Sequence, residues 1–248
     1  MSGHSKWSTI KHKKAANDSK RGKLFSKLVK EITAAARLGG GDVDMNPRLR
    51  TAIATAKSSN VPSDNIDKAI LRGTGDLEGE SIEEIVYEGY GPGGVALMIE
   101  VITDNKNRAI ADIRHTLGKY EGRIGERGCV AWGFDKCGLI VVDANTIEED
   151  DLFLVAADAG AEDITSLENA FEVITPFDQF DNVVTAIQTT EADVQLAELS
   201  MIPQNTVKLE GKEAERMLKL MDALDELDDV QKVYANFDIP DDILEAAA

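Results

Sequence analysis

The sequence has few of the residues from which disulfide scaffolds and metal centres are built. Its 248 residues include two cysteines, Cys129 and Cys137, and three histidines, His4, His12 and His115. Two cysteines cannot form a disulfide framework, and these lack the C-x-x-C spacing of zinc and redox sites. We therefore expect a reducing compartment, no metal, and cysteines that act as small buried apolar side chains within strands.

Long apolar runs are missing as well. No stretch approaches the ~18 apolar residues that a membrane-spanning helix requires. The opening "MSGHSKWSTIKHKK" has no apolar core like that of a signal peptide, and it uses Lys where a mitochondrial leader would favour Arg. The expectation is a cytoplasmic protein without a processed leader.

Signals for catalysis are also few. The segment "GYGPGG" lacks the Lys and Ser/Thr of a phosphate-binding loop, and its glycines fit a tight turn. His115 lies in a predicted helix beside Arg114 and is interpreted as a surface residue. Acidic stretches such as "TIEEDD" and "DALDELDD" fall on predicted helix faces, where solvent or a basic protein partner would meet them. The expectation is a protein that is not an enzyme and that carries no cofactor.

What the sequence does contain is an unequal distribution of charge. Residues 1–75 hold 15 Lys and Arg against 6 Asp and Glu, a net charge of +9. The other residues hold 12 against 39, a net charge of −27, so that the whole chain carries −18. An asymmetry of this kind points to a polyanion or a membrane surface as partner of the basic part.

The basic part contains an amphipathic helical pattern that starts near Ser19. Apolar residues recur at three- and four-residue spacing on one side, and Lys20, Lys23, Lys27, Lys30 and Arg37 fall on the other. Such a stripe is often only a solvated helix face, and a basic amphipathic helix can also lie on a membrane. Here the stripe has few compensating acids and continues a basic arm, which favours phosphate binding with release of counterions.

We therefore predict a nucleic-acid interface in residues 2–37. Trp7 can stack on a base or serve as a hydrophobic anchor. If eight phosphates were neutralised, log K would fall against log salt with a slope of about −7 on duplex DNA. Exchange of Lys20, Lys23, Lys27 and Lys30 for Glu is expected to leave the fold intact. The candidate residues are Lys6, Trp7, Lys11, Lys13, Lys14, Lys20, Arg21, Lys23, Lys27, Lys30 and Arg37.

Two further helices should complete a small helical domain. Asn46 is the expected cap of the second, with Pro47 at its first position. The third should begin near Ser63 and end at Gly73, which would take the left-handed conformation after the helix. With the basic arm, these helices define a first domain of residues 1–78.

The rest of the chain alternates strands and helices. Residues 133–204 show the order β-α-β-β-α-β, which is that of the ferredoxin-like split βαβ unit. Strand patterns in residues 79–132 and in residues 205–240 lie on either side of it. The segment "CVAWGFDKCGLIVVD", which crosses from the first of these ranges into 133–204, is also predicted to be strand. We predict an α+β fold of three domains, in which 79–132 and 205–240 form one discontinuous α/β domain and 133–204 is inserted.

Several long strings resemble the YebC/PmpR family, which includes the mitochondrial translational activator of cytochrome oxidase. They are "GHSKWSTIKHKKAANDSKRGKLFSKLVKEITAAARLGGGD", "NPRLRTAIATAKSSNVPSDNIDKAILRGTG", "YEGYGPGGVALMIEVITDNKNR" and "DIRHTLGKYEGRIGERGCVAWGF". The similarity is dense over residues 2–134. It implies three domains, a cytosolic location in bacteria and no catalysis.

The resemblance implies two roles, DNA-binding transcriptional regulation or assistance to ribosomes that stall on proline-rich stretches. The first is our leading hypothesis, and a ribosome-associated translation factor is the alternative. Phosphate contacts carry no sequence information, so the lysines do not separate the two. A small-molecule sensor is a further alternative, based only on fold analogy. The acidic part could meet a protein partner, and the oligomeric state stays open, with a monomer compatible.

Overall fold

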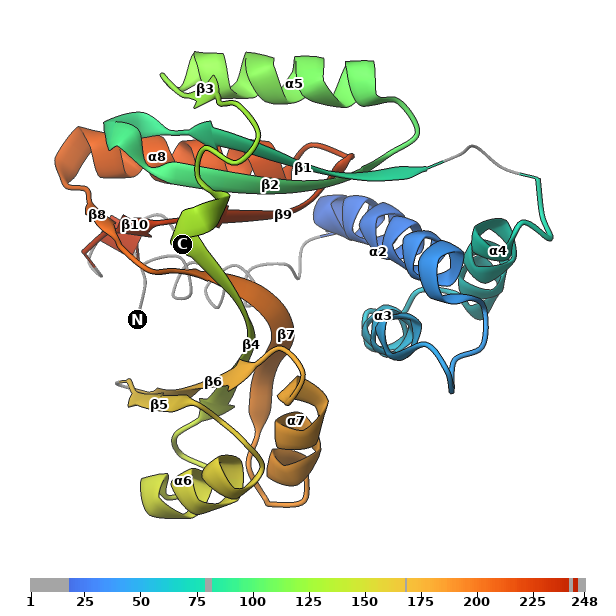
Figure 1. The fold of residues 1–248 in the computed structure, drawn as a ribbon, viewed down its shortest axis with the longest axis vertical. Helices are drawn as coiled ribbons and strands as arrows, with labels where there is room; N and C mark the ends of the chain where they lie inside the picture. The colour runs from blue at the N-terminus through green and yellow to red at the C-terminus, as the bar shows by residue number, and fades with distance from the viewer. Residues whose placement is uncertain (1–17, 79–81, 168, 241–242, 245–248) are drawn as a thin grey trace.

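The protein consists of three packed parts, as the computed structural model shows (Figure 1). The structure describes residues 18–78, 82–167, 169–240 and 243–244. A group of helices lies beside a four-stranded sheet, and a second four-stranded sheet is connected to the first by two long strands. The predicted α+β class with an N-terminal helical part and two α/β parts is confirmed.

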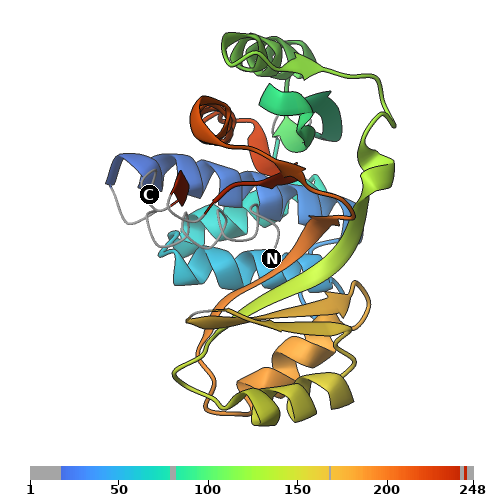
Figure 2. The same ribbon diagram turned by 90° about the vertical axis from the view of Figure 1, so that its left-hand side faces the viewer.

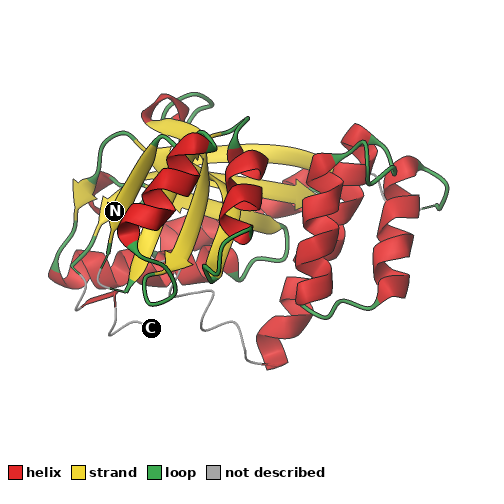
Figure 3. Ribbon diagram, turned by 90° about the horizontal axis from the view of Figure 1, so that it is seen from below, coloured by secondary structure: helices red, strands yellow, loops and turns green. Residues whose placement is uncertain are grey.

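The helical part lies beside the sheets (Figure 3). Its elements are α2 (Asp18–Gly39), α3 (Pro47–Ser58) and α4 (Ser63–Thr74). Its core joins Ile32 of α2 to Leu49 of α3 and Ile66 of α4, and alanines on the facing surfaces let the helix axes approach closely. The apolar side of the predicted amphipathic helix is therefore used for packing.

The helix ends are partly as predicted. Asn46 caps α3, because its side chain accepts a hydrogen bond from the amide of Leu49 at 3.1 Å. The prediction for Gly73 was wrong, since Gly75 takes the left-handed conformation after α4, with φ +86°. Gly73 lies inside the helix, where an added Cβ would come within 2.5 Å of the Thr33 carbonyl oxygen. Its lack of a side chain thus serves the close contact between α2 and α4.

The middle sheet is built from both ends of the α/β region. Its strand order is β3-β1-β2-β9, and β2 pairs antiparallel with β9, so the last long strand returns to the sheet begun by β1 and β2. Helices α5 and α8 pack side by side on one face of the sheet (Figure 1). Strands β8 and β10 pair with each other in a separate two-stranded parallel sheet. The elements of this part of the chain are β1 (Glu83–Tyr90), η1 (Pro92–Gly94), β2 (Ala96–Thr103), α5 (Lys106–Lys119), β3 (Arg123–Ile124), β8 (Val207–Lys208), α8 (Gly211–Asp225), β9 (Val230–Ala235) and β10 (Phe237–Asp238).

The remaining sheet has the strand order β5-β6-β4-β7 with antiparallel pairing throughout. This order, with α6 and α7 packed on one face, is that of the ferredoxin-like unit and confirms the prediction. Strands β4 and β7 continue towards the middle sheet (Figure 2). The domain boundaries 1–78, 79–132 with 205–240, and 133–204 stay predictions. The elements are β4 (Phe134–Asp143), α6 (Glu149–Asp158), β5 (Asp163–Ser166), β6 (Ala170–Pro176), α7 (Phe180–Gln188) and β7 (Val194–Pro203).

One predicted strand segment is a loop. Cys129 lies in the connection that precedes β4, and η2 (Ala131–Gly133) follows it. The prediction that Cys129 belongs to a strand pair was therefore wrong, and its side chain is half-buried. Cys137 is buried in β4 as expected, and burial raises the pKa of its thiol to about 11. A thiol of this kind is protonated at neutral pH and is a poor nucleophile.

Candidate nucleic-acid interface

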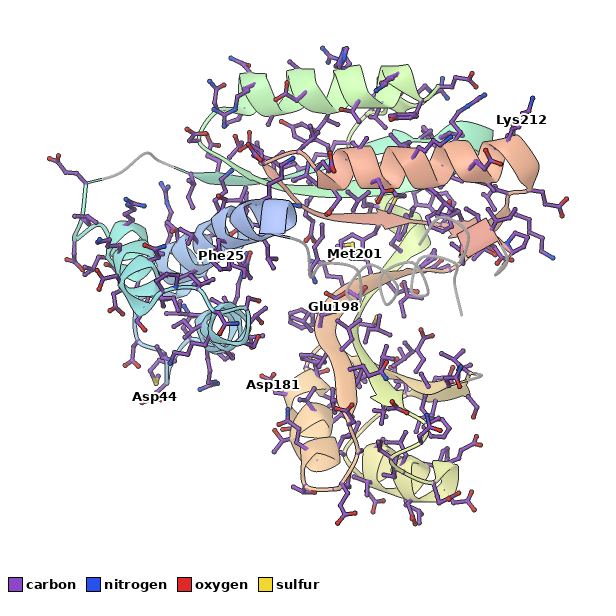
Figure 4. The ribbon with its side chains drawn as sticks, turned by 180° about the vertical axis from the view of Figure 1, so that it is seen from behind. Phe25, Asp44, Asp181, Glu198, Met201 and Lys212 are labelled. Carbon is purple, nitrogen blue, oxygen red and sulfur yellow. The ribbon has the colours of Figure 1, made fainter. Side chains whose placement is uncertain are left out.

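The lysine stripe of α2 faces the C-terminal end of α8. In Figure 4, Lys212 marks the first turn of α8 at the end remote from α2, so the last turn is the one that meets the stripe. That turn continues into the segment Asp225–Glu226–Leu227–Asp228–Asp229, which leads into β9. We call residues 225–229 the acidic turn.

Three lysines of the stripe donate hydrogen bonds to the acidic turn. Lys23 Nζ lies 3.0 Å from the carbonyl oxygen of Glu226. Lys27 Nζ lies 2.6 Å from the carbonyl oxygen of Asp225 and 3.1 Å from its Oδ1. Lys30 Nζ donates to the carbonyl oxygen of Asp228 at 2.8 Å. It also donates to Oδ1 of Asp229 at 2.7 Å.

These contacts are favourable for two separate reasons. The carbonyl groups in the last turn of a helix have no partner within that helix and carry partial negative charge. The ammonium groups of Lys23 and Lys27 bind such carbonyls at the end of α8. In addition, the side chains of the Lys30–Asp229 pair are only 23% and 7% exposed, so water screens their attraction much less than that of a surface pair.

Asp229 is the most buried carboxylate of this contact. Its oxygens accept hydrogen bonds from Lys30 and also from the guanidinium of Arg108 on α5, whose Nη2 lies 2.9 Å from Oδ2. Burial by itself would raise the pKa of Asp229, but the hydrogen bonds from Lys30 and Arg108 hold that pKa below its usual value. Asp229 is therefore ionised at neutral pH and joins α2, α5 and the start of β9.

A second contact fixes the helical part to the middle sheet. Arg48 of α3 donates through Nε to Glu31 at 2.8 Å and through Nη1 to Glu84 of β1 at 2.9 Å. Together with the lysine contacts, it holds the helical part against the α/β region. The helical part thus lies at a defined place on the α/β region.

The candidate residues fall into four groups. Lys23, Lys27 and Lys30 are brought together at the acidic turn, where Lys27 and Lys30 are half-buried and Lys23 is exposed. Arg37 lies near the other end of α2 and donates to the carbonyl oxygen of Ile82 at 2.8 Å. Lys20 and Arg21 belong to the first turn of α2. The remaining candidates, Lys6, Trp7, Lys11, Lys13 and Lys14, lie outside the described residues.

Two expectations need correction. Lys27 and Lys30 were expected on a solvated face, yet their side chains are only 13% and 23% exposed. Their exchange for Glu would place new carboxylates against the acidic turn, so these contacts argue against the expectation that such a variant keeps its fold, which stays a prediction. The carboxylates of "DALDELDD" were interpreted as solvated or as a site for a basic partner, and a helix of the same chain meets them.

The structure also bears on metal ligands, membrane-spanning helices and His115. Within the described parts of the chain, no group of three or more His, Cys, Asp or Glu is arranged to hold a metal ion. No helix among the described residues is both long enough and apolar enough to span a bilayer. His115 lies on α5, where its side chain is exposed.

Comparison with known proteins extends these observations to the whole chain. A family profile described as "TACO1/YebC protein N-terminal domain" matches residues 5–76, and one described as "TACO1/YebC second and third domain" matches residues 82–237. A "probable transcriptional regulatory protein" of Desulforapulum autotrophicum is 58% identical over 99% of this chain and 100% of its own. Another with that description, from Syntrophobacter fumaroxidans, is 54% identical over the full length of both chains.

A solved structure gives the same picture. The crystal structure of a conserved hypothetical protein from Aquifex aeolicus superposes with a TM-score of 0.82 at 44% sequence identity. The superposition covers 90% of this chain and 93% of that one. The fold, the profiles and the full-length relatives agree, and the chain belongs to the TACO1/YebC family.

Proposed function

We propose that this protein is a cytoplasmic, non-enzymatic regulator of gene expression that binds the phosphate backbone of nucleic acid, with DNA as its first target, through residues 2–37. The observation that carries the proposal is the separation of charge. A net +9 is confined to residues 1–75, and the remaining −27 would repel a polyanion from the rest of the molecule.

The contacts of α2 divide the proposed binding residues into two sets. Lys23, Lys27 and Lys30 hydrogen-bond to the acidic turn and form the docked set. A phosphate must compete with that turn for them. The arm set is the group of cations in residues 6–21, and it would make the first contacts with nucleic acid. It comprises Lys6, Lys11, Lys13, Lys14, Lys20 and Arg21.

This division changes the expected salt dependence. If the six cations of the arm set bind phosphate and the docked set stays in place, the slope of log K against log salt on duplex DNA is about −5. If the docked set is released as well, nine cations contribute and the slope approaches about −8. The measured slope therefore reports whether α2 leaves the acidic turn on binding.

The test compares two neutralised variants of the full-length protein. In one, the six residues of the arm set become Gln. In the control, four exposed cations of α3 and α4 (Arg50, Lys57, Lys68 and Arg72) become Gln, and Arg48 is kept. Fluorescence anisotropy with labelled duplex DNA should show binding lost at ~0.15 M salt in the first variant and nearly retained in the control. Equal affinity of the arm variant and the unmodified protein would refute the proposal.

DNA is placed first because the relatives are described as transcriptional regulatory proteins. Phosphate contacts position a protein but do not distinguish DNA from ribosomal RNA. Crosslinking in cells, followed by sequencing of the bound nucleic acid, decides the target. Recovery of genomic DNA supports the proposal, and recovery of ribosomal RNA alone would replace it with the role of a ribosome-associated translation factor.

A further inference from the structure

A surface remote in sequence from the basic arm combines an exposed aromatic ring with two exposed arginines. Two neighbouring hollows of about 670 and 190 Å³ open where the turn between β1 and β2 meets the loop before β4. They share Tyr90 and Gly94. Arg123 lines the larger hollow, and Trp132 lines the smaller one.

Trp132 is the most exposed aromatic side chain among the described large apolar residues, at 73%. Its indole Nε1 donates a hydrogen bond to the carbonyl oxygen of Cys129 at 3.1 Å. The hydroxyl of Tyr90 donates to the same oxygen at 3.3 Å. The polar atoms of both rings are thus used within the protein, and Trp132 offers a ligand its flat faces.

The loop that carries Trp132 is held in place by a buried carboxylate. Glu88 of β1 is only 6% exposed. Its oxygens accept hydrogen bonds from the amides of Gly128 at 2.5 Å, Val130 at 2.8 Å and Ala131 at 2.9 Å. A ring presented on a fixed loop loses little conformational freedom when a ligand binds, which favours recognition.

Two arginines lie near these rings in sequence, although the region that contains the rings carries a strong net negative charge. The guanidinium of Arg123 lies 5.3 Å from the centre of the Tyr90 ring, and Arg127 is exposed nearby in the sequence. In the described part of the chain, neither arginine forms an ion pair. The acid that lines the larger hollow, Glu121, is paired with Arg216. Arg123 therefore lies beside the ring of Tyr90, and Arg127 adds a second positive charge close to Glu88, within a strongly acidic region.

We propose that this surface binds unpaired nucleotides, with a base stacked on Trp132 and the adjoining phosphates at Arg123 and Arg127. Sites for single strands combine these two elements, because the face of an unpaired base can stack on an aromatic ring while cations follow the backbone. A duplex cannot supply that face, since its bases stack on one another. An apolar peptide would cover Trp132 but leave the two guanidinium groups without an anion.

The site goes beyond the interface of residues 2–37, although it depends on the proposed function for nucleic acid as the partner. Its test uses full-length protein with Trp7→Phe, so that Trp132 is the single tryptophan. The probe is oligo(dT) or oligo(U) of about 12 nucleotides, a length within the usual range of single-strand sites. Saturable quenching of Trp132 fluorescence is expected with either probe, and little quenching with a duplex of the same length.

Variants separate stacking from general attraction. Trp132→Ala should weaken single-strand binding about 5- to 100-fold and leave duplex binding nearly unchanged, whereas Trp132→Phe should retain most of the single-strand affinity. Arg123→Gln should make the single-strand salt slope less negative by about 0.7. Phe153→Ala is the matched control, since Phe153 is a 57% exposed aromatic on α6, and it should change nothing.

The outcomes distinguish this inference from the function on which it depends. Single-strand affinity that is equal in the Trp132→Ala variant and the parent would overturn the inference while duplex binding through the arm remains. Binding of a neutral proline-rich peptide that quenches Trp132, with no effect of the oligonucleotides, would overturn it in favour of a protein partner. Absence of binding to any nucleic acid would overturn the inference and the proposed function together.

Discussion

The contact between Lys30 and Asp229 allows a quantitative test of how firmly α2 is docked. The two charged groups approach to 2.7 Å, and their side chains are 23% and 7% exposed. We consider Lys30→Met, which keeps most of the apolar stem, Asp229→Asn, which keeps the shape of the side chain, and the double variant. Arg108 remains in all four proteins, so the cycle isolates the coupling between Lys30 and Asp229.

The expected coupling free energy follows from burial and from the number of partners. A hydrogen bond between charged groups contributes about 1.5–3 kcal/mol, and an exposed ion pair about 0.2–1 kcal/mol. The Lys30–Asp229 pair belongs with the first class because little water reaches it. Asp229 also pairs with Arg108, which compensates part of its charge when Lys30 is lost. We therefore expect a coupling of about 1–2 kcal/mol.

Native-state hydrogen exchange detected by mass spectrometry is the suitable assay, because global unfolding of a protein with several domains is not a two-state process. The quantity compared is the opening free energy of peptides from α2 and from the end of α8, with α7 peptides as internal reference. A coupling below about 0.5 kcal/mol would place the contact among ordinary surface pairs and refute the argument that α2 is firmly docked.

The same variant gives a prediction for nucleic-acid binding. If release of α2 costs about 1–2 kcal/mol and phosphate binding uses the released lysines, Asp229→Asn should tighten binding to duplex DNA by at most about 5- to 30-fold. The salt slope should change from about −5 towards about −8. A tighter complex with an unchanged slope would mean that the lost negative charge, and not the release of the docked set, caused the gain.

Three further predictions concern the elements that support these surfaces. Glu88 has a pKa below its usual 4.5, since burial raises it but the three amide hydrogen bonds lower it more. Its stabilisation of the Trp132 loop should therefore be complete above pH 4.5 and be lost as pH falls below it; Glu88→Gln should remove this pH dependence, as hydrogen exchange of the loop would show. Asn46 is 5% exposed and donates to the carbonyls of Ala35 and Gly40 while capping α3, so Asn46→Ala should lower the opening free energy of the helical part by about 2–4 kcal/mol. Gly73→Ala should lower it by about 1–3 kcal/mol through overpacking against Thr33, and unchanged exchange in α2 and α4 would contradict this reason.

Local patterns were sufficient for most of the fold. Asn46 followed by Pro47 defined the start of α3, because capping chemistry depends on residues close in sequence. The β-α-β-β-α-β order defined the ferredoxin-like unit for the same reason. Gly73 was misassigned because a glycine required for helix packing and one required for a left-handed turn look alike in sequence. Only the neighbouring helix distinguishes them.

The role of the lysine stripe could not be derived in this way. The partners Lys30 and Asp229 are 199 positions apart, and nothing in either local pattern refers to the other. The segment "CVAWGF" has the apolar composition of a strand. Its backbone nevertheless forms a loop, because amides in and just before this segment donate hydrogen bonds to the carboxylate of Glu88, which lies about 40 positions earlier in the sequence. Trp132 was therefore assigned to a strand, where it would not have been recognised as an exposed ring.

The docked set also changes how the basic helix should be tested. Exchange of Lys20, Lys23, Lys27 and Lys30 for Glu would remove cations from a binding surface and would also place carboxylates against Asp225 and Asp229, where like charges repel. Loss of binding in that variant would have two explanations, and a displaced α2 alone could cause it. Neutralisation of the arm set leaves the contact with the acidic turn in place, whereas Asp229→Asn weakens that contact and leaves every cation present. If α2 competes with phosphate as argued, the first change weakens binding and the second strengthens it, and a purely structural role of the stripe cannot produce that opposition in sign.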